Sequence, residues 1–251
     1  MKNQSLFDYL LHLGDNSLIL GHRLSEWCGH GPILEVDMAL TNISLDLIGQ
    51  TRNYFQYAAE IEGKGRSEDE LAFLRVDRQY KNVLLVERPN GNFAETIARQ
   101  FYFDSFHKPF LEKLQASQDE QIAAIAAKSL KEVTYHLRFS TDWVVRLGDG
   151  TEESREKMQD AVEEFWTYTA DLFKATDLER EMVKEGIAVD VEQMKVPFME
   201  HVEDTFARAN LKLPDFEPMQ VGGKEGLHSE HLGHLLAELQ YMQRAYPNMQ
   251  W

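Results

Sequence analysis

The stretch Ser129-Leu-Lys-Glu-Val-Thr-Tyr-His-Leu-Arg-Phe-Ser140 is typical of a core helix that carries polar side chains inward. At 3.6 residues per turn, one face of this helix holds Glu132, Tyr135, His136, Phe139 and Trp143. We therefore expect a carboxylate, a phenol and an imidazole to lie among aromatic rings on a buried helix. Helical bundles that bind two iron ions carry Glu-x-x-His on such a helix, because side chains at i and i+3 reach one metal centre together. Here the i+3 residue is Tyr135, and the histidine follows at i+4.

Helical periodicity continues on both sides of this stretch, and no alternating strand pattern interrupts it. Four long helices are expected at about 5–28, 33–62, 92–116 and 119–147, followed by additional helices within 153–251. Asn92 is the expected N-cap of the third long helix. The second is apolar almost all round, which is typical of a helix in the middle of a bundle. The sequence predicts an all-α fold.

Four long helices with inward polar groups suggest one ferritin-like domain, residues 1–251, with a four-helix bundle core. A di-iron site in such a bundle uses about four carboxylates and two histidines, with Glu-x-x-His on two helices. The inward polar candidates are Asp15, Asp46, Asp104, His107, Glu132, Tyr135 and His136. Position +3 from Asp46 is Gly49, and position +3 from Glu132 is Tyr135, so both paired motifs are missing. We interpret the set as a degenerate site whose members bond to one another, and we expect no metal or cofactor in this chain.

Two metal-binding alternatives stay open. In the first, the chain is a metal-dependent, di-iron-like oxidase in its own right, with ligands drawn from Asp46, Asp104, His107, Glu132 and His136. In the second, zinc binds the last predicted helix, where His228, His231 and Glu238 share a face and His234 lies nearby. Because the His-x-x-His spacing lacks a convincing third ligand, we favour docking or capping as the use of that helix.

Composition excludes several classes of partner. Acidic residues outnumber basic residues by 42 to 26, which gives a net charge of −16. Nucleic acid and anionic membranes both require a positive footprint, so neither is an expected partner. No run reaches the ~18 apolar residues of a membrane span. Cys28 is the single cysteine, which excludes an internal disulfide and favours a cytoplasmic protein.

Several motifs together resemble one family. They are Leu13-Gly-Asp-Asn16, Glu26-Trp-Cys-Gly29, Leu45-Asp-Leu-Ile-Gly-Gln50, Asn90-Gly-Asn-Phe93, Tyr135-His-Leu-Arg-Phe-Ser140 and Gly226-Leu-His-Ser-Glu-His-Leu-Gly233. Across essentially the whole chain the sequence resembles the PaaC family, the phenylacetic acid degradation proteins that form the C subunit of ring-1,2-phenylacetyl-CoA epoxidase. The resemblance implies a ferritin-like fold without the iron site.

The resemblance also implies a role and partners. The chain would be a non-catalytic structural subunit of a multicomponent monooxygenase that acts in aerobic phenylacetate degradation. The catalytic A subunit, its main partner, would carry the di-iron centre, and NADPH and the reductase cofactors would lie elsewhere in the complex. We assign no catalytic residue to this chain. A helical interaction protein of an unrelated assembly is a further alternative.

Phenylacetyl-CoA itself is a candidate ligand at a subunit interface. The segment Arg75-Val-Asp-Arg-Gln-Tyr-Lys-Asn82 places Arg75, Arg78 and Lys81 at i, i+3 and i+6, which is unusually basic for so acidic a chain. Such cations suit CoA phosphates, with Gln79, Tyr80 and Asn82 as hydrogen-bonding or stacking groups and Arg180 as a weaker candidate. An ordinary solvated helix face is the alternative that we favour.

Overall fold

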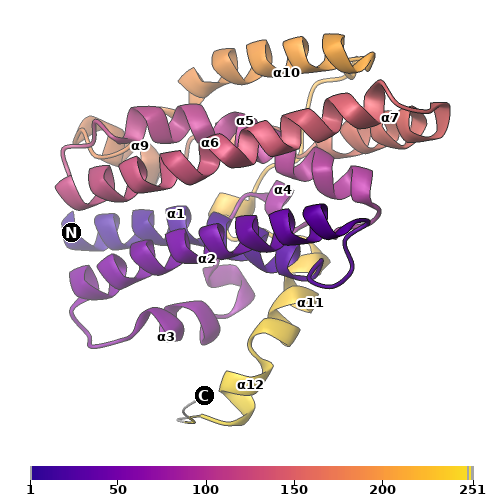
Figure 1. Cartoon of the computed structure of the whole chain (residues 1–251). Helices are drawn as coiled ribbons and strands as arrows, with labels where there is room; N and C mark the ends of the chain where they lie inside the picture. Colours follow the sequence, from indigo (N-terminus) through magenta and orange to yellow (C-terminus); the bar gives the residue numbers. More distant parts are fainter. Residues whose placement is uncertain (1, 248, 250–251) are drawn as a thin grey trace. The chain divides into compact units, whose positions relative to one another are not determined.

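The computed structural model describes residues 2–247 and 249, and over these residues helices are the only regular secondary structure (Figure 1). The all-α prediction is therefore confirmed, and long paired helices are what a ferritin-like bundle requires. The chain divides into two compact units, residues 1–88 with 222–251 and residues 89–221. The grouping of all helices into one domain stays a prediction. None of the described helices has the length and apolar character needed to cross a membrane.

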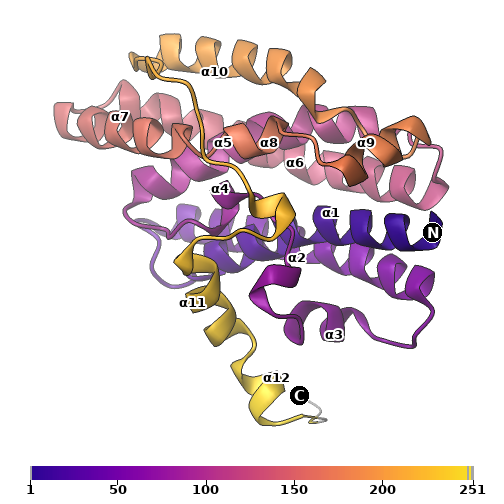
Figure 2. The same ribbon diagram turned by 180° about the vertical axis from the view of Figure 1, so that it is seen from behind.

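The first unit is built on the antiparallel helices α1 (Lys2–Ser25) and α2 (Leu34–Glu62), which run side by side (Figures 1 and 2). The two helices approach closely because glycines lie at their contact. A Cβ atom at Gly14 would overlap the ring of Phe55, and the Ser44 hydroxyl donates to the Gly21 carbonyl at 2.7 Å. The other elements are α3 (Glu68–Phe73), the 3-10 helices η1 (Asp77–Gln79) and η3 (Gly223–Glu225), α4 (Leu84–Glu87), α11 (Glu230–Leu239) and α12 (Tyr241–Ala245).

The second unit is built on the antiparallel helices α5 (Phe93–Leu114) and α6 (Glu120–Gly148). The predicted N-cap of α5 is confirmed, because the Asn92 side chain accepts from the amides of Ala94 and Glu95, at 2.8 and 3.2 Å. Around this pair lie α7 (Glu152–Trp166), α8 (Ala170–Phe173), α9 (Asp177–Lys184), η2 (Val191–Met194) and α10 (Lys195–Ala209). Fully or nearly fully buried aromatic rings fill the space between α5 and α10, among them Phe101, Tyr102, Phe198 and Phe206.

The prediction that α2 is covered on all sides is wrong for one of its faces. Leu34, Met38, Leu45 and Ile48 are 71%, 56%, 61% and 41% exposed. Their spacing of four, seven and three residues places them in one line along the helix, which we call the α2 stripe. The sequence pattern misled because helical periodicity does not distinguish an exposed apolar face from an apolar face that is buried in the same fold.

Candidate functional site

A buried polar cluster lies between α5 and α6. Asp104 is fully buried on α5 and accepts hydrogen bonds from Gln100 Nε2 at 2.7 Å and from Ser140 Oγ at 2.8 Å. His107 and His136 are buried on the same two helices. We call these five residues the α5–α6 cluster. It contains three of the residues that the sequence marked as a degenerate metal site.

The low polarity of this core shifts the proton affinities of the cluster. Burial raises the pKa of Asp104 to about 7, although the electrostatic interaction with His136 and the hydrogen bonds from Ser140 and Gln100 act in the opposite direction. Burial also lowers the pKa of His107 to about 3, and the nearby His136 adds to this effect. The His107 imidazole is therefore neutral at pH 7, while the Asp104 carboxyl titrates near neutrality.

The inward face of α6 differs from the predicted one. Within residues 129–140, the buried residues are Ser129, Val133, His136 and Ser140. Tyr135, predicted to be buried beside His136, is 39% exposed, and Glu132 is half-buried. Each residue turns the helix by 100°, so Tyr135 belongs to the neighbouring, outward stripe. The phenol is thus not part of the α5–α6 cluster.

The described residues contain no group of three or more His, Cys, Asp or Glu side chains that is placed to hold a metal ion. Of the predicted set, Asp104, His107 and His136 lie in the α5–α6 cluster. Asp15 and Asp46 belong to α1 and α2 in the other unit. That the chain works without a bound metal stays a prediction.

Asp15 is engaged by Arg75 within the first unit. Arg75 Nη1 lies 2.9 Å from Asp15 Oδ2, Nη2 contacts the other carboxylate oxygen, and the Lys81 amide donates to Oδ2 at 2.8 Å. The guanidinium also lies over the rings of Tyr80 and Phe55, 4.2 and 5.2 Å from their centroids. The Asp15 side chain is 0% exposed and the Arg75 side chain is 4% exposed, so this is a buried ion pair. The Asp15 carboxylate is therefore paired with Arg75, a cation of the same chain.

This pairing separates the residues predicted to contact CoA. Residues 77–79 form a 3-10 turn instead of continuing an α-helix, so Arg75 turns inward and does not share an exposed patch with Arg78. The buried members of the predicted set are Arg75, Tyr80 and Asn82, whereas Arg78 and Gln79 are exposed and Lys81 is half-buried. Arg180 lies on α9 in the other unit, where its Nη1 is 3.2 Å from Asp177 Oδ1. CoA binding by any of these residues stays a prediction.

His228, one of the residues considered for zinc, is bound to a buried carboxylate. Its Nδ1 lies 2.9 Å from Glu87 Oε2, and its Nε2 lies 2.9 Å from the Tyr80 carbonyl oxygen. The Ser229 amide and Asn82 Nδ2 also donate to Glu87, at 2.6 and 3.0 Å. Both ring nitrogens face acceptors, which is the geometry of a charged imidazolium. This pair fastens the start of α11 and the residues just before it to α4 inside the first unit.

The environment of His228 also determines its proton affinity. Burial opposes the charged ring, but the hydrogen bond to Glu87 and the charge of that carboxylate outweigh burial and raise the pKa of His228. His231 is half-buried and His234 and Glu238 are exposed on α11. The pair with Glu87 supports a capping role for this part of the chain, and a metal role has no third ligand among the described residues.

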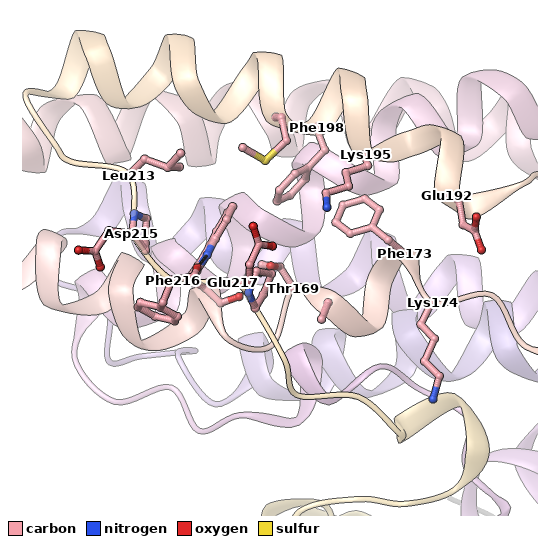
Figure 3. A pocket seen from close by; sticks show the side chains of 15 residues that line it. Thr169, Phe173, Lys174, Glu192, Lys195, Phe198, Leu213, Asp215, Phe216 and Glu217 are labelled. Carbon is pink, nitrogen blue, oxygen red and sulfur yellow. Dashed lines mark hydrogen bonds between the residues drawn. The ribbon is translucent and has the colours of Figure 1, made fainter.

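An aromatic pocket of about 740 Å³ lies in the second unit between α8, η2, α10 and the segment 213–218 (Figure 3). Phe173, Phe198 and Phe216 are among the rings that line it, and Lys195 and Glu217 extend toward it in the close view. No pattern in the sequence indicated this pocket. Its lining residues come from separate elements, and each aromatic group alone is typical of an ordinary core.

The comparisons with known proteins agree over nearly the full length of the chain. Residues 1–251 match the model of a family described as phenylacetic acid catabolic protein. The chain is 52% identical over 243 residues to the C subunit of 1,2-phenylacetyl-CoA epoxidase from Escherichia coli (strain K12). The matched region covers 97% of this chain and 98% of the relative.

Proposed function

This chain belongs to the family of phenylacetic acid catabolic proteins, and we propose that it is the structural C subunit of a 1,2-phenylacetyl-CoA epoxidase. The observation that carries the proposal is the 52% identity over nearly the whole of both chains. In this proposal a catalytic A subunit holds the di-iron centre and epoxidises the aromatic ring. Electrons from NADPH reach that centre through a reductase subunit, and the complex works in the cytoplasm.

The contacts of the inward carboxylates support a non-catalytic role. Asp15 is engaged by Arg75, and Asp104 is engaged by Gln100 and Ser140. A metal ion would have to replace these protein donors, and breaking a buried ion pair is unfavourable because the remaining charge is left without compensation. In this proposal Arg75 neutralises Asp15, and hydrogen bonds from Gln100 and Ser140 satisfy Asp104, in place of a metal ion.

The α2 stripe supports the association with a partner. Four large apolar side chains along one helix face, from Leu34 to Ile48, form the kind of surface that stable subunits bury against each other. The spacing of the stripe matches the seam of two packed helices. Such a surface, packed against the catalytic subunit, would hold that subunit in its productive shape.

The test is to measure iron in the chain alone and in complex with the catalytic subunit. Each sample is loaded with ferrous iron under anaerobic conditions, desalted and assayed for metal and for co-elution of the two chains. We expect stable co-elution, no retained iron in this chain alone, and about two irons in the complex. The catalytic subunit alone serves as the positive control for loading.

About two irons held by the isolated chain would overturn the structural role. That result would support the oxidase alternative, with Asp46, Asp104, His107, Glu132 and His136 as the first ligands to replace. Failure of the two chains to associate would overturn the proposed partnership.

A further inference from the structure

The outer side of α6 carries an aromatic stripe flanked by cations. Tyr135, Phe139 and Trp143 follow one another at intervals of four residues, with ring centroids 6.3 and 6.4 Å apart. Tyr135 is exposed, and the other two rings are half-buried. We call the stripe and its flanking cations the α6 face; its members are Lys128, Lys131, Tyr135, Arg138, Phe139, Trp143 and Arg146.

Contacts within the chain hold the rings of the α6 face in place. The Arg138 guanidinium lies 5.7 Å from the centroid of the Tyr135 ring, and the Arg146 guanidinium lies 5.3 Å from that of Trp143. Phe93 packs edge-on against Trp143 with centroids 5.1 Å apart. Rings and guanidinium groups ordered in advance lose little conformational entropy when a partner binds.

The charge of the α6 face is opposite to that of the chain. Lys128, Lys131, Arg138 and Arg146 are exposed there, and the acidic residues on the same side are Glu132 and Asp142. Four cations against two carboxylates leave an excess of two positive charges on a chain whose net charge is −16. In the part of the chain that the structure describes, none of the four cations has an ion-pair partner.

We propose that the α6 face docks the catalytic subunit, through an apolar patch on that subunit bordered by carboxylates. This inference rests on the proposed function and adds to it a binding surface with its chemistry. Trp, Tyr and Arg are the residues that most often dominate binding energy at the centre of protein interfaces. The planar guanidinium groups of Arg138 and Arg146 suit carboxylate partners, and the positive excess steers an acidic surface toward the face.

The test compares binding of the catalytic subunit to the wild-type chain and to three variants by titration calorimetry. Lys128→Glu with Lys131→Glu reverses two exposed charges without altering a ring, and Tyr135→Ala with Arg138→Ala removes one stacked pair. Arg208→Glu is the matched control, an exposed arginine on α10 paired with Asp204. We expect Kd to rise by about tenfold or more in the two α6 variants, more steeply at low salt for the charge reversal, and to stay near the wild-type value in the control.

Each outcome separates the two proposals. If the wild-type chain does not bind the catalytic subunit, the proposed function itself fails. If the wild-type chain binds and both α6 variants bind equally well, with unchanged circular dichroism and thermal unfolding, the α6 face is not the docking surface. If the variants instead abolish self-association of this chain in sedimentation, a second copy occupies the face and the inference is overturned.

Discussion

Replacing Arg75 with methionine tests the buried ion pair that occupies Asp15. Methionine keeps much of the apolar volume but removes the charge and the donors to the Asp15 carboxylate, which is fully buried. Removing one partner of a buried pair costs about 3–5 kcal/mol, because the other charge remains without compensation. For a chain of this size each kcal/mol lowers Tm by about 2–4 °C, so we expect a decrease of about 6–20 °C.

Thermal and urea unfolding followed by circular dichroism measure this effect. Asp15→Asn combined with Arg75→Met should recover much of the lost stability, since neither charge is then buried alone. Arg52→Met is the control: its ion pair with Glu68 is exposed on the arginine side, and its loss should cost less than about 1 kcal/mol. The reasoning would be refuted if Arg75→Met lowered the free energy of unfolding as little as Arg52→Met does. It would also be refuted if the stability losses of Asp15→Asn and Arg75→Met simply added in the double variant.

Two further predictions concern the first unit. Because the pKa of His228 is raised in the fold, its pair with Glu87 should stabilise the chain fully below about pH 6.5 and lose that contribution as pH rises through the raised pKa. Unfolding measured from pH 6 to 9 should show this loss in the wild type and not in His228→Gln; equal slopes would contradict it. If Arg78 and Lys81 contact CoA in the proposed complex, Arg78→Ala with Lys81→Ala raises the apparent KM of that complex for its CoA ester. The kcat is measured in the same assay, and Arg52→Ala is the control. An unchanged KM would exclude these two cations from CoA binding.

Local patterns in the sequence were enough to predict most of the secondary structure. The 3.6-residue periodicity locates the long helices, and Asn92 marks the start of α5, because caps act within one helical turn. The missing Glu-x-x-His motifs could likewise be recognised without coordinates. These features depend on residues close together along the chain, so no knowledge of packing was required.

The candidate sites were predicted less completely, because their members are distant in sequence. Asp15 and Arg75 are separated by 60 residues, and His228 and Glu87 by 141. The spacing of Arg75, Arg78 and Lys81 suggested one basic patch, yet the 3-10 turn at 77–79 directs Arg75 into the core. Sequence spacing predicts neighbours only while the backbone keeps one helical geometry.

By itself, the sequence determined that this protein is helical and acidic, and that it lacks both paired metal motifs. Only the tertiary structure decided which side chains satisfy the buried carboxylates, and which apolar and aromatic faces remain open on α2 and α6. The reason is physical. Helix formation follows from short-range periodicity, whereas the pairing of a buried charge and the exposure of a helix face depend on which distant segments pack against them.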